Sequence, residues 1–181
     1  MAYKLKKTVV LVGMMGAGKT AVGLALARII GVEFRDSDTE LEKAAAMSIA
    51  EIFSRDGEPF FRQRESEVLL RLLDGKNCIL SAGGGAFLAE RNRTTISQHG
   101  VSVWLKADLQ LLWSRVRHKN TRPLLRTSNP RETLRELCAT REPSYRQANI
   151  VVCARPEYSV EDMTMAVIQA LLEKDDVLER S

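Results

Sequence analysis

The stretch GMMGAGKT at residues 13–20 decides the fold of this chain. It matches the pattern G-x-x-x-x-G-K-[S/T], follows the β-branched apolar run Thr8–Val12, and leads into a helical pattern over Lys19–Ile30. In such a loop the glycines let backbone N–H groups close around phosphate oxygens, and the N-terminus of the next helix adds a partial positive charge. The stretch therefore predicts a nucleoside triphosphate site, and its strand–loop–helix context disfavours a glycine-rich loop without a ligand.

Two side chains of this loop are suited to specific contacts with the triphosphate. Lys19 is placed to reach the β- and γ-phosphates, and the Thr20 hydroxyl is placed to ligate Mg²⁺. The residues expected to contact the nucleotide here are Gly13, Met14, Gly16, Ala17, Gly18, Lys19, Thr20 and Ala21. The loop identifies a phosphate donor and leaves the acceptor open.

The bulk composition is that of an ordinary soluble domain. With 181 residues, 45% of them hydrophobic and 28% charged, the chain is expected to form one domain over 1–181. Its apolar runs are far shorter than a membrane span, and Met1–Lys7 leads into the first strand without a signal-peptide core, so we expect a cytoplasmic protein. Three cysteines without C-x-x-C spacing and two scattered histidines indicate neither a disulfide framework nor a zinc site.

Arginine outnumbers lysine, and arginines are dense toward the C-terminal half. The members of this group are Arg115, Arg117, Arg122, Arg126, Arg131, Arg135, Arg141 and Arg146. Nucleic-acid binding is one interpretation of such density. Acidic residues are interspersed, however, and no aromatic stacking pattern accompanies the arginines. A small anionic substrate and a nucleotide therefore explain them better than a nucleic acid, because guanidinium groups suit bidentate recognition of carboxylate and phosphate.

Strand and helix patterns alternate along the chain. The predicted strands are Thr8–Val12, Glu33–Arg35, Cys78–Ser81, Val101–Leu105 and Ile150–Cys153. The predicted helices are Lys19–Ile30, Thr39–Ala46, one N-capped by Ser48 with Glu51 completing a capping box, Phe60–Leu73, Leu88–Gln98, Asp108–Arg117, Arg131–Ala139 and Val160–Leu172. This order predicts an α/β fold of three layers, α/β/α, with a five-stranded parallel sheet. Ligands bind beyond the carboxyl ends of such strands, where residues 13–20, 36–38 and 82–85 fall.

Two carboxylates follow the second predicted strand. Asp36 and Asp38 stand two residues apart, and in an extended segment such side chains point the same way. One could hold Mg²⁺, usually through water, while the other takes a proton from an attacking hydroxyl. N-capping of the following helix is the alternative for either residue.

Two further patterns are ambiguous when taken alone. Arg62 and Glu65 are spaced i, i+3 on a predicted helix, where a surface ion pair is the default interpretation. Gly83, Gly84 and Gly85 at the end of a strand allow backbone to approach a ligand closely, or form a flexible turn.

The segment 117–131 reads as a mobile lid. It carries Arg122 next to the rigid Pro123, and an arginine delivered by a lid would stabilise charge on a transferring phosphoryl group. A solvated basic loop is the alternative.

In order and spacing, these motifs together resemble the shikimate kinase family over almost the whole chain. The motifs are GMMGAGKT at 13–20, Asp-Ser-Asp at 36–38, Phe-Arg-x-x-Glu at 61–65, Gly-Gly-Gly at 83–85 and Arg-Pro-Leu-Leu at 122–125. The resemblance implies a P-loop kinase fold with a segment that binds shikimate at about 36–65 and a lid at about 117–131. It implies transfer of the γ-phosphoryl group of ATP, with Mg²⁺, to the 3-hydroxyl of shikimate.

The resemblance also implies a role for each acceptor residue. Asp36 would serve the Mg²⁺ site, while Asp38 would bind the acceptor hydroxyls and act as the base. Arg62, supported by Glu65, would pair with the shikimate carboxylate, and Arg141 matches a second arginine of that kind. Gly83, Gly84 and Gly85 resemble the glycines that bind the acceptor.

On the donor side, the resemblance implies that Arg122 contacts both substrates and takes part in catalysis together with Lys19 and Asp38. Arg115 resembles an arginine that stacks on adenine, and Arg155 with Pro156 falls where the base is contacted from the other side. The sequence departs from many relatives at Ala82, where a hydroxyl residue is common, so that position is given no metal role.

Two rival functions remain open at this point. Another small-molecule P-loop kinase, acting on gluconate or a nucleoside monophosphate, would need other acceptor residues. A nucleotide-binding or RNA-binding module without catalysis would show strongly salt-dependent nucleic-acid binding. The expected partners are ATP and shikimate alone, with no nucleic acid and no membrane, and a monomer is the default because no long exposed apolar stripe demands a partner.

Overall fold

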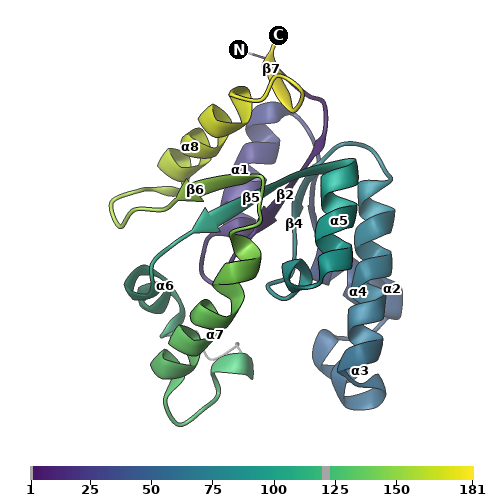
Figure 1. Cartoon of the computed structure of the whole chain (residues 1–181), viewed down its shortest axis with the longest axis vertical. Helices are drawn as coiled ribbons and strands as arrows, with labels where there is room; N and C mark the ends of the chain where they lie inside the picture. The colour runs from purple at the N-terminus through teal and green to yellow at the C-terminus, as the bar shows by residue number, and fades with distance from the viewer. Residues whose placement is uncertain (1, 120–122) are drawn as a thin grey trace.

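A computed structural model describes residues 2–119 and 123–181 and contains a central parallel sheet (Figure 1). The strands lie in the order β3 (Phe34–Asp36), β4 (Ile79–Ser81), β2 (Thr8–Val12), β5 (Gly100–Lys106) and β6 (Ile150–Cys153). Neighbouring strands are parallel throughout, which confirms the predicted five-stranded sheet. The central strand β2 is buried along its whole length, as expected for a strand covered on both faces.

Helices cover both faces of this sheet. The helices are α1 (Lys19–Ile30), α2 (Ser37–Ala45), α3 (Ile49–Asp56), α4 (Glu58–Leu73), α5 (Glu90–His99), α6 (Leu109–Val116), α7 (Pro130–Tyr145) and α8 (Val160–Leu172), with short 3₁₀ helices η1 (Ala86–Leu88) and η2 (Pro123–Leu125). Helices α1 and α8 pack together on one face, while α5 lies against β5 on the other (Figure 1). The three-layer α/β/α architecture is confirmed, and the carboxyl ends of the strands meet α6, α7 and the loops that carry the predicted motifs.

The chain termini form a strand pair that the sequence analysis missed. β1 (Tyr3–Leu5) and β7 (Leu178–Arg180) pair antiparallel, so that both ends of the chain lie together (Figure 1). Strands of three residues carry too little alternation to be recognised, and their partner lies at the opposite end of the sequence. Only the fold brings them into contact.

One helix extends well beyond its predicted end. The helix predicted over Arg131–Ala139 runs from Pro130 to Tyr145, with Pro143 inside it. Pro143 has no N–H to donate to the carbonyl four residues earlier, and the helix ends two residues after it, at Tyr145. The predicted capping box of Ser48 and Glu51 is confirmed at the start of α3.

Within the described residues, none of the helices combines the length and the apolar composition needed to span a bilayer.

Candidate active site

The phosphate-binding motif forms a glycine-dependent loop between β2 and α1. Gly13, Gly16 and Gly18 have φ angles of 143°, 80° and 96°, conformations that other residues rarely adopt. A Cβ atom on Gly13 would also lie only 2.9 Å from the Leu105 carbonyl oxygen. Glycine is therefore required for both the path and the packing of this loop, which leads into the N-terminus of α1.

Two cationic side chains hold the loop. Lys19 Nζ donates hydrogen bonds to the carbonyl oxygens of Gly13 at 2.6 Å and Met14 at 3.2 Å. Arg115 on α6 donates from Nη1 to the Gly16 carbonyl oxygen at 2.9 Å. Both contacts place positive charge at the loop, where a triphosphate would bind.

The structure corrects the predicted geometry of the two aspartates. Asp36 ends β3, and α2 begins at Ser37, so Asp38 lies in the first turn of a helix and not in an extended segment. Asp36 caps this helix, because its Oδ1 accepts a hydrogen bond from the Thr39 backbone N–H at 3.0 Å. The capping alternative therefore holds for Asp36, and its second oxygen is left for other ligands.

Asp38 is nevertheless electrostatically coupled to Asp36. Burial, together with the negative charges of Asp36 and Glu65, raises the pKa of Asp38 to about 6, against the opposing effect of the nearby Lys19 ammonium. The Asp38 carboxylate is therefore mostly ionised at neutral pH, and its pKa lies close to that pH. A pKa near the working pH is the property of an efficient general base.

The oxygen ligands available for a divalent cation fit Mg²⁺. Thr20 supplies a hydroxyl and Asp36 a carboxylate, and hard oxygen ligands of this kind suit Mg²⁺. Within residues 2–119 and 123–181, no cluster of three or more His, Cys, Asp or Glu side chains could hold a metal by itself. A cation at this position would therefore complete its coordination with phosphate oxygens and water, as Mg²⁺ usually does.

The triple-glycine loop after β4 lies against the predicted acceptor residues. A Cβ atom on Gly83 would approach Asp38 Oδ1 to 2.5 Å, and one on Gly84 would approach Arg141 Nη1 to 2.8 Å. A Cβ atom on Gly85 would lie 2.6 Å from the Nη1 and Nη2 atoms of Arg62. Each glycine therefore makes room for a different charged side chain, and the three side chains converge on one loop.

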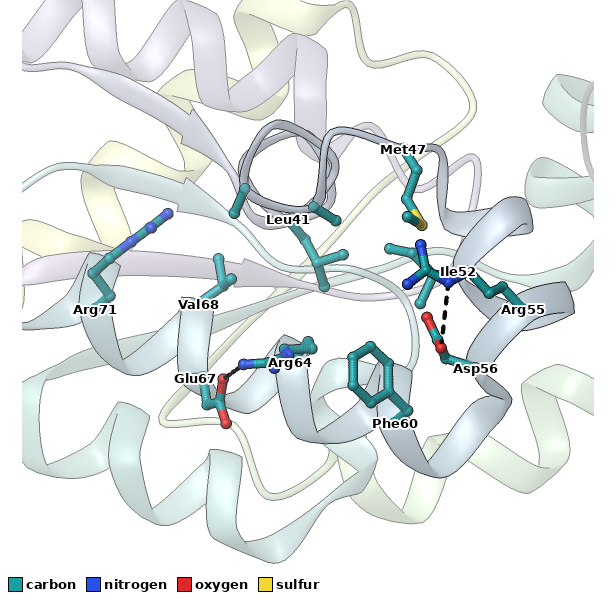
Figure 2. A pocket seen from close by; sticks show the side chains of 12 residues that line it. Leu41, Met47, Ile52, Arg55, Asp56, Phe60, Arg64, Glu67, Val68 and Arg71 are labelled. Carbon is teal, nitrogen blue, oxygen red and sulfur yellow. Dashed lines mark hydrogen bonds and ion pairs between the residues drawn. The ribbon is translucent and has the colours of Figure 1, made fainter.

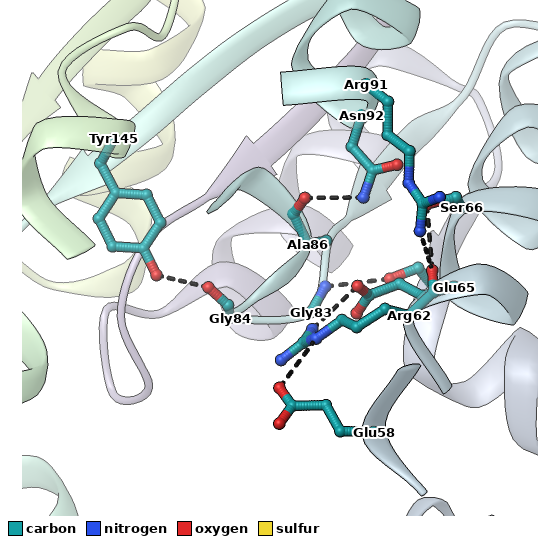
Figure 3. A network of polar contacts seen from close by, with 11 residues as sticks. Glu58, Arg62, Glu65, Ser66, Gly83, Gly84, Ala86, Arg91, Asn92 and Tyr145 are labelled. Carbon is teal, nitrogen blue, oxygen red and sulfur yellow. Dashed lines mark hydrogen bonds and ion pairs between the residues drawn. The ribbon is translucent and has the colours of Figure 1, made fainter. Parts of the chain in front are cut away.

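Arg62 and Glu65 on α4 form a pair in which Glu65 is buried and Arg62 partly buried, and not the surface pair that their spacing alone suggested (Figure 3). Glu65 is only 3% exposed, and its Oε1 accepts a hydrogen bond from Arg62 Nη1 at 2.9 Å. Burial raises the pKa of Glu65, while the positive charges of Arg62, Arg91 and Arg141 oppose that rise. Glu65 thus lies among guanidinium groups and fixes the orientation of Arg62.

Several polar residues of this site were missed from the sequence. Tyr145 donates a hydrogen bond from its hydroxyl to the Gly84 carbonyl oxygen at 2.7 Å (Figure 3). Ser37 Oγ accepts one from the Gly83 N–H at 3.0 Å, and Arg91 Nη2 donates to the Arg62 carbonyl oxygen at 3.0 Å. The position of Tyr145 four residues after Arg141, on the same helical face, is the signal that could have identified it.

The predicted nucleotide contacts outside the phosphate-binding loop include Arg122, Arg155 and Pro156. Arg122, the predicted lid arginine, is outside the described residues, and η2 follows directly after it. Arg155 and Pro156 are exposed beyond the end of β6, where the Arg155 guanidinium lies 5.5 Å from the Tyr158 ring centroid.

A pocket of about 590 Å³ between α2, α3 and α4 is separate from this site (Figure 2). Its lining includes apolar Leu41, Ile52 and Val68 and the ion pair Arg64–Glu67, with Nη1 and Oε2 2.7 Å apart. Arg64 and Glu67 each follow Arg62 and Glu65 by two residues, and positions two apart on a helix point in nearly opposite directions. The residues that line this pocket therefore do not include the predicted catalytic and binding residues.

Comparisons with known proteins agree on one family. A sequence model of the shikimate kinase family matches residues 15–172. The chain is 64% identical to a shikimate kinase of Ruegeria pomeroyi over 99% of this chain and 92% of the relative, and 65% identical to one of Cereibacter sphaeroides over 97% and 88%. A solved structure of shikimate kinase from Acinetobacter baumannii in complex with shikimate superposes with a TM-score of 0.86 at 38% identity, covering 93% of this chain and 94% of the other.

Proposed function

The chain belongs to the shikimate kinase family, and we propose that it transfers the γ-phosphoryl group of ATP to the 3-hydroxyl of shikimate, giving shikimate 3-phosphate and ADP. This reaction belongs to chorismate and aromatic amino-acid biosynthesis. The observation that carries the assignment to these residues is the triple-glycine loop, against which Asp38, Arg141 and Arg62 converge. One carboxylate and two guanidinium groups suit an acceptor that bears both a hydroxyl and a carboxylate.

The donor side is supported by the loop geometry. The backbone N–H groups of residues 13–18 and the N-terminus of α1 would bind the phosphates of ATP, and Lys19 would neutralise their charge. Mg²⁺, when bound through the Thr20 hydroxyl and the Asp36 carboxylate, supplies charge neutralisation on the β- and γ-phosphates. Positioning and charge neutralisation are the main requirements of phosphoryl transfer, and these residues supply both.

On the acceptor side, Arg62 and Arg141 would bind the shikimate carboxylate and thereby orient the ring. The 3-hydroxyl oxygen then forms a bond to the γ-phosphorus as the bond to the bridging β-phosphate oxygen breaks. The hydroxyl proton passes to the Asp38 carboxylate, whose pKa of about 6 leaves it ionised and able to accept a proton at neutral pH. Glu65 would hold Arg62 in the orientation that this binding needs.

Further roles follow from the family and rest on sequence matches. Arg122 would contact both substrates from the lid at about 117–131 and stabilise charge on the transferring group. Arg115 would stack on adenine, with Arg155 and Pro156 contacting the base from the other side. We further propose one domain, a monomeric state and a cytoplasmic location, with ATP and shikimate as the partners.

One assay distinguishes this function from its rivals. Release of ADP is measured with shikimate, with gluconate and with a panel of nucleoside monophosphates at equal concentrations. Turnover with shikimate alone is expected, because gluconate and nucleotides do not place a ring carboxylate between Arg62 and Arg141. Preferred turnover with another acceptor would reject the proposal. Salt-dependent RNA binding without acceptor-dependent turnover would favour a nucleic-acid-binding module.

A further inference from the structure

Tyr145 is a buried residue that the proposed mechanism does not use. Its side chain is 1% exposed at the last position of α7, one helical turn after Arg141, which is 8% exposed. Residues spaced i, i+4 lie on the same helical face, so both side chains project from α7 toward the acceptor loop. A buried hydroxyl must find a hydrogen-bond partner, and the identity of that partner decides what the residue can control.

The partner of this hydroxyl is the central glycine of the triple-glycine loop. Tyr145 donates to the Gly84 carbonyl oxygen at 2.7 Å, and its side chain extends toward that loop from the opposite side to Arg62 (Figure 3). Burial raises the pKa of the hydroxyl above its ordinary value, so it remains a protonated donor across the neutral range. The same residue of the loop, Gly84, is the one against which Arg141 Nη1 lies.

Tyr145 also touches the donor side of the site. Its hydroxyl oxygen lies 4.0 Å from Met14 Sδ in the phosphate-binding loop, and its ring centroid lies 5.8 Å from that of Trp104 on β5. The ring is therefore wedged between the loop that would hold ATP and the loop that would hold shikimate.

The triple-glycine loop is held from its other side by Ser37. The Gly83 N–H donates to Ser37 Oγ at 3.0 Å, and Ser37 directly precedes Asp38 in α2. Ser37 is 3% exposed, so this bond is shielded from water. Ser37 lies on the same helix as Asp38, and Tyr145 lies on the same helix as Arg141. Each hydrogen bond to the loop therefore involves a helix that also carries one of the charged side chains next to the glycines.

We propose that Tyr145 is a positioning residue for the acceptor, which fixes Gly84 and Arg141 relative to the phosphate-binding loop, with Ser37 fixing Gly83 and Asp38 from the opposite side. The inference rests on the proposed function, because it takes shikimate as the acceptor. We expect Tyr145 to affect acceptor binding because its hydroxyl bonds to the carbonyl oxygen of Gly84. The Arg141 guanidinium lies against Gly84, so a small shift of this residue would displace Arg141. A role limited to packing would leave that geometry unchanged when the hydroxyl alone is removed.

The test replaces Tyr145 by phenylalanine, which keeps the ring and removes the hydroxyl. We expect the KM for shikimate to rise about three- to ten-fold, the change that corresponds to one lost hydrogen bond, while the KM for ATP stays within two-fold. Tyr3→Phe is the matched control, since Tyr3 lies in β1 at the chain termini, and its kinetic constants are expected to remain unchanged. Ser37→Ala should reproduce the shift in KM from the other side of the loop.

A double variant tests whether Tyr145 acts through Arg141. If it does, Tyr145→Phe combined with Arg141→Ala raises the KM for shikimate no further than Arg141→Ala alone. Independent multiplication of the two effects would overturn the positioning role, as would an unchanged KM in Tyr145→Phe.

Hydrogen exchange gives a measurement that needs no substrate. Peptides that cover residues 82–88 should exchange faster in Tyr145→Phe than in the wild-type protein and Tyr3→Phe, because Gly84 has lost the hydrogen bond between its carbonyl oxygen and the Tyr145 hydroxyl. Unchanged exchange there contradicts the inference. Absence of shikimate turnover in the wild-type protein, with faster exchange in the variant, would instead reject the proposed function and retain the role of Tyr145 in holding the loop.

Discussion

The backbone of Gly84 lies directly against the guanidinium group of Arg141, so that a Cβ atom at residue 84 would come within 2.8 Å of Arg141 Nη1. Arg141 is buried on α7, and Gly84 belongs to the loop after β4, more than fifty positions earlier in the chain. The proximity couples the shape of the acceptor loop to the position of a carboxylate-binding arginine. It also makes the loop testable by adding a single methyl group.

Gly84→Ala should impair shikimate binding more than folding. The added Cβ displaces the Arg141 guanidinium, and Gly84 does not have a positive φ angle that would strain the backbone. We expect the KM for shikimate to rise about ten-fold, with a change in the free energy of unfolding below about 1 kcal/mol, measured by steady-state kinetics and urea denaturation. The control is Gly75→Ala, where the nearest atom to a new Cβ lies 3.5 Å away, and its kinetics should match the wild type. Equal KM values for both variants would contradict the assignment of Arg141.

Arg62→Ala should cost both substrate affinity and stability. It removes a contact to the shikimate carboxylate and leaves the buried Glu65 without its 2.9 Å charged hydrogen bond. We expect an increased KM for shikimate and a loss of about 1 to 3 kcal/mol in the free energy of unfolding at pH 8. The lost stability should shrink as the pH falls, because Glu65, whose pKa is already raised by burial, then becomes protonated.

Arg64→Ala is the matched control on the same helix. Arg64 is 52% exposed and pairs with the exposed Glu67, so its removal should change the free energy of unfolding by no more than about 0.5 kcal/mol and leave KM unchanged. Comparable losses in the two variants would show that the Arg62–Glu65 pair is an ordinary surface pair. A reduced affinity for ATP alone in Arg62→Ala would also contradict the role given to Arg62.

Asp38→Asn should reduce kcat and yet stabilise the folded protein at neutral pH. The variant cannot accept the hydroxyl proton, and loss of a general base lowers kcat by about 10²- to 10⁴-fold. Because the folded-state pKa of about 6 lies above the ordinary value of 3.8, the ionised carboxylate destabilises the fold at pH above 6. Its replacement should therefore stabilise the protein by about 1 to 3 kcal/mol at pH 8, an advantage that disappears as the pH falls from 6 toward 4.

The pH dependence of the wild-type enzyme follows from the same group. The value of kcat/KM for shikimate should fall below pH about 6, as Asp38 becomes protonated and can no longer accept a proton. Measurement between pH 5 and pH 8 in a buffer of constant ionic strength provides the profile. Near-normal turnover in Asp38→Asn, or a flat profile across pH 6, would remove Asp38 as the base.

Removal of Mg²⁺ with EDTA should abolish turnover without lowering the melting temperature of the protein alone. The described residues offer no protein-only cluster of ligands, so the cation depends on the phosphates of ATP for its binding. Added Mg²⁺ should restore full activity in the same sample. A drop of several degrees in Tm on chelation without nucleotide would point to a structural metal and contradict this picture.

Much of the architecture was predictable from local sequence. A five-stranded parallel sheet was predicted from the motif at 13–20, the apolar strand patterns and the helix signals. The order of the strands in the sheet came from the structure. The prediction failed where local signals were weak or overridden. The three-residue strands at the termini depend on pairing across the whole chain, and the helix that ends at Tyr145 continues past the alanine at which its pattern stops. The assumption of an extended segment at Asp38 was wrong because Asp36 caps a helix that begins at once.

The sequence by itself determined which chemical groups are present and on which elements they lie, because phosphate-loop glycines, helix caps and strand patterns act over a few neighbouring residues. Only the tertiary structure decided which groups meet. Glu65 became a buried partner of Arg62, and Tyr145 reached Gly84, because packing of α4 and α7 against the same loop brings together residues far apart in the chain. Burial then shifted the pKa of Asp38, an effect that depends on surrounding dielectric and charge and that no local pattern encodes.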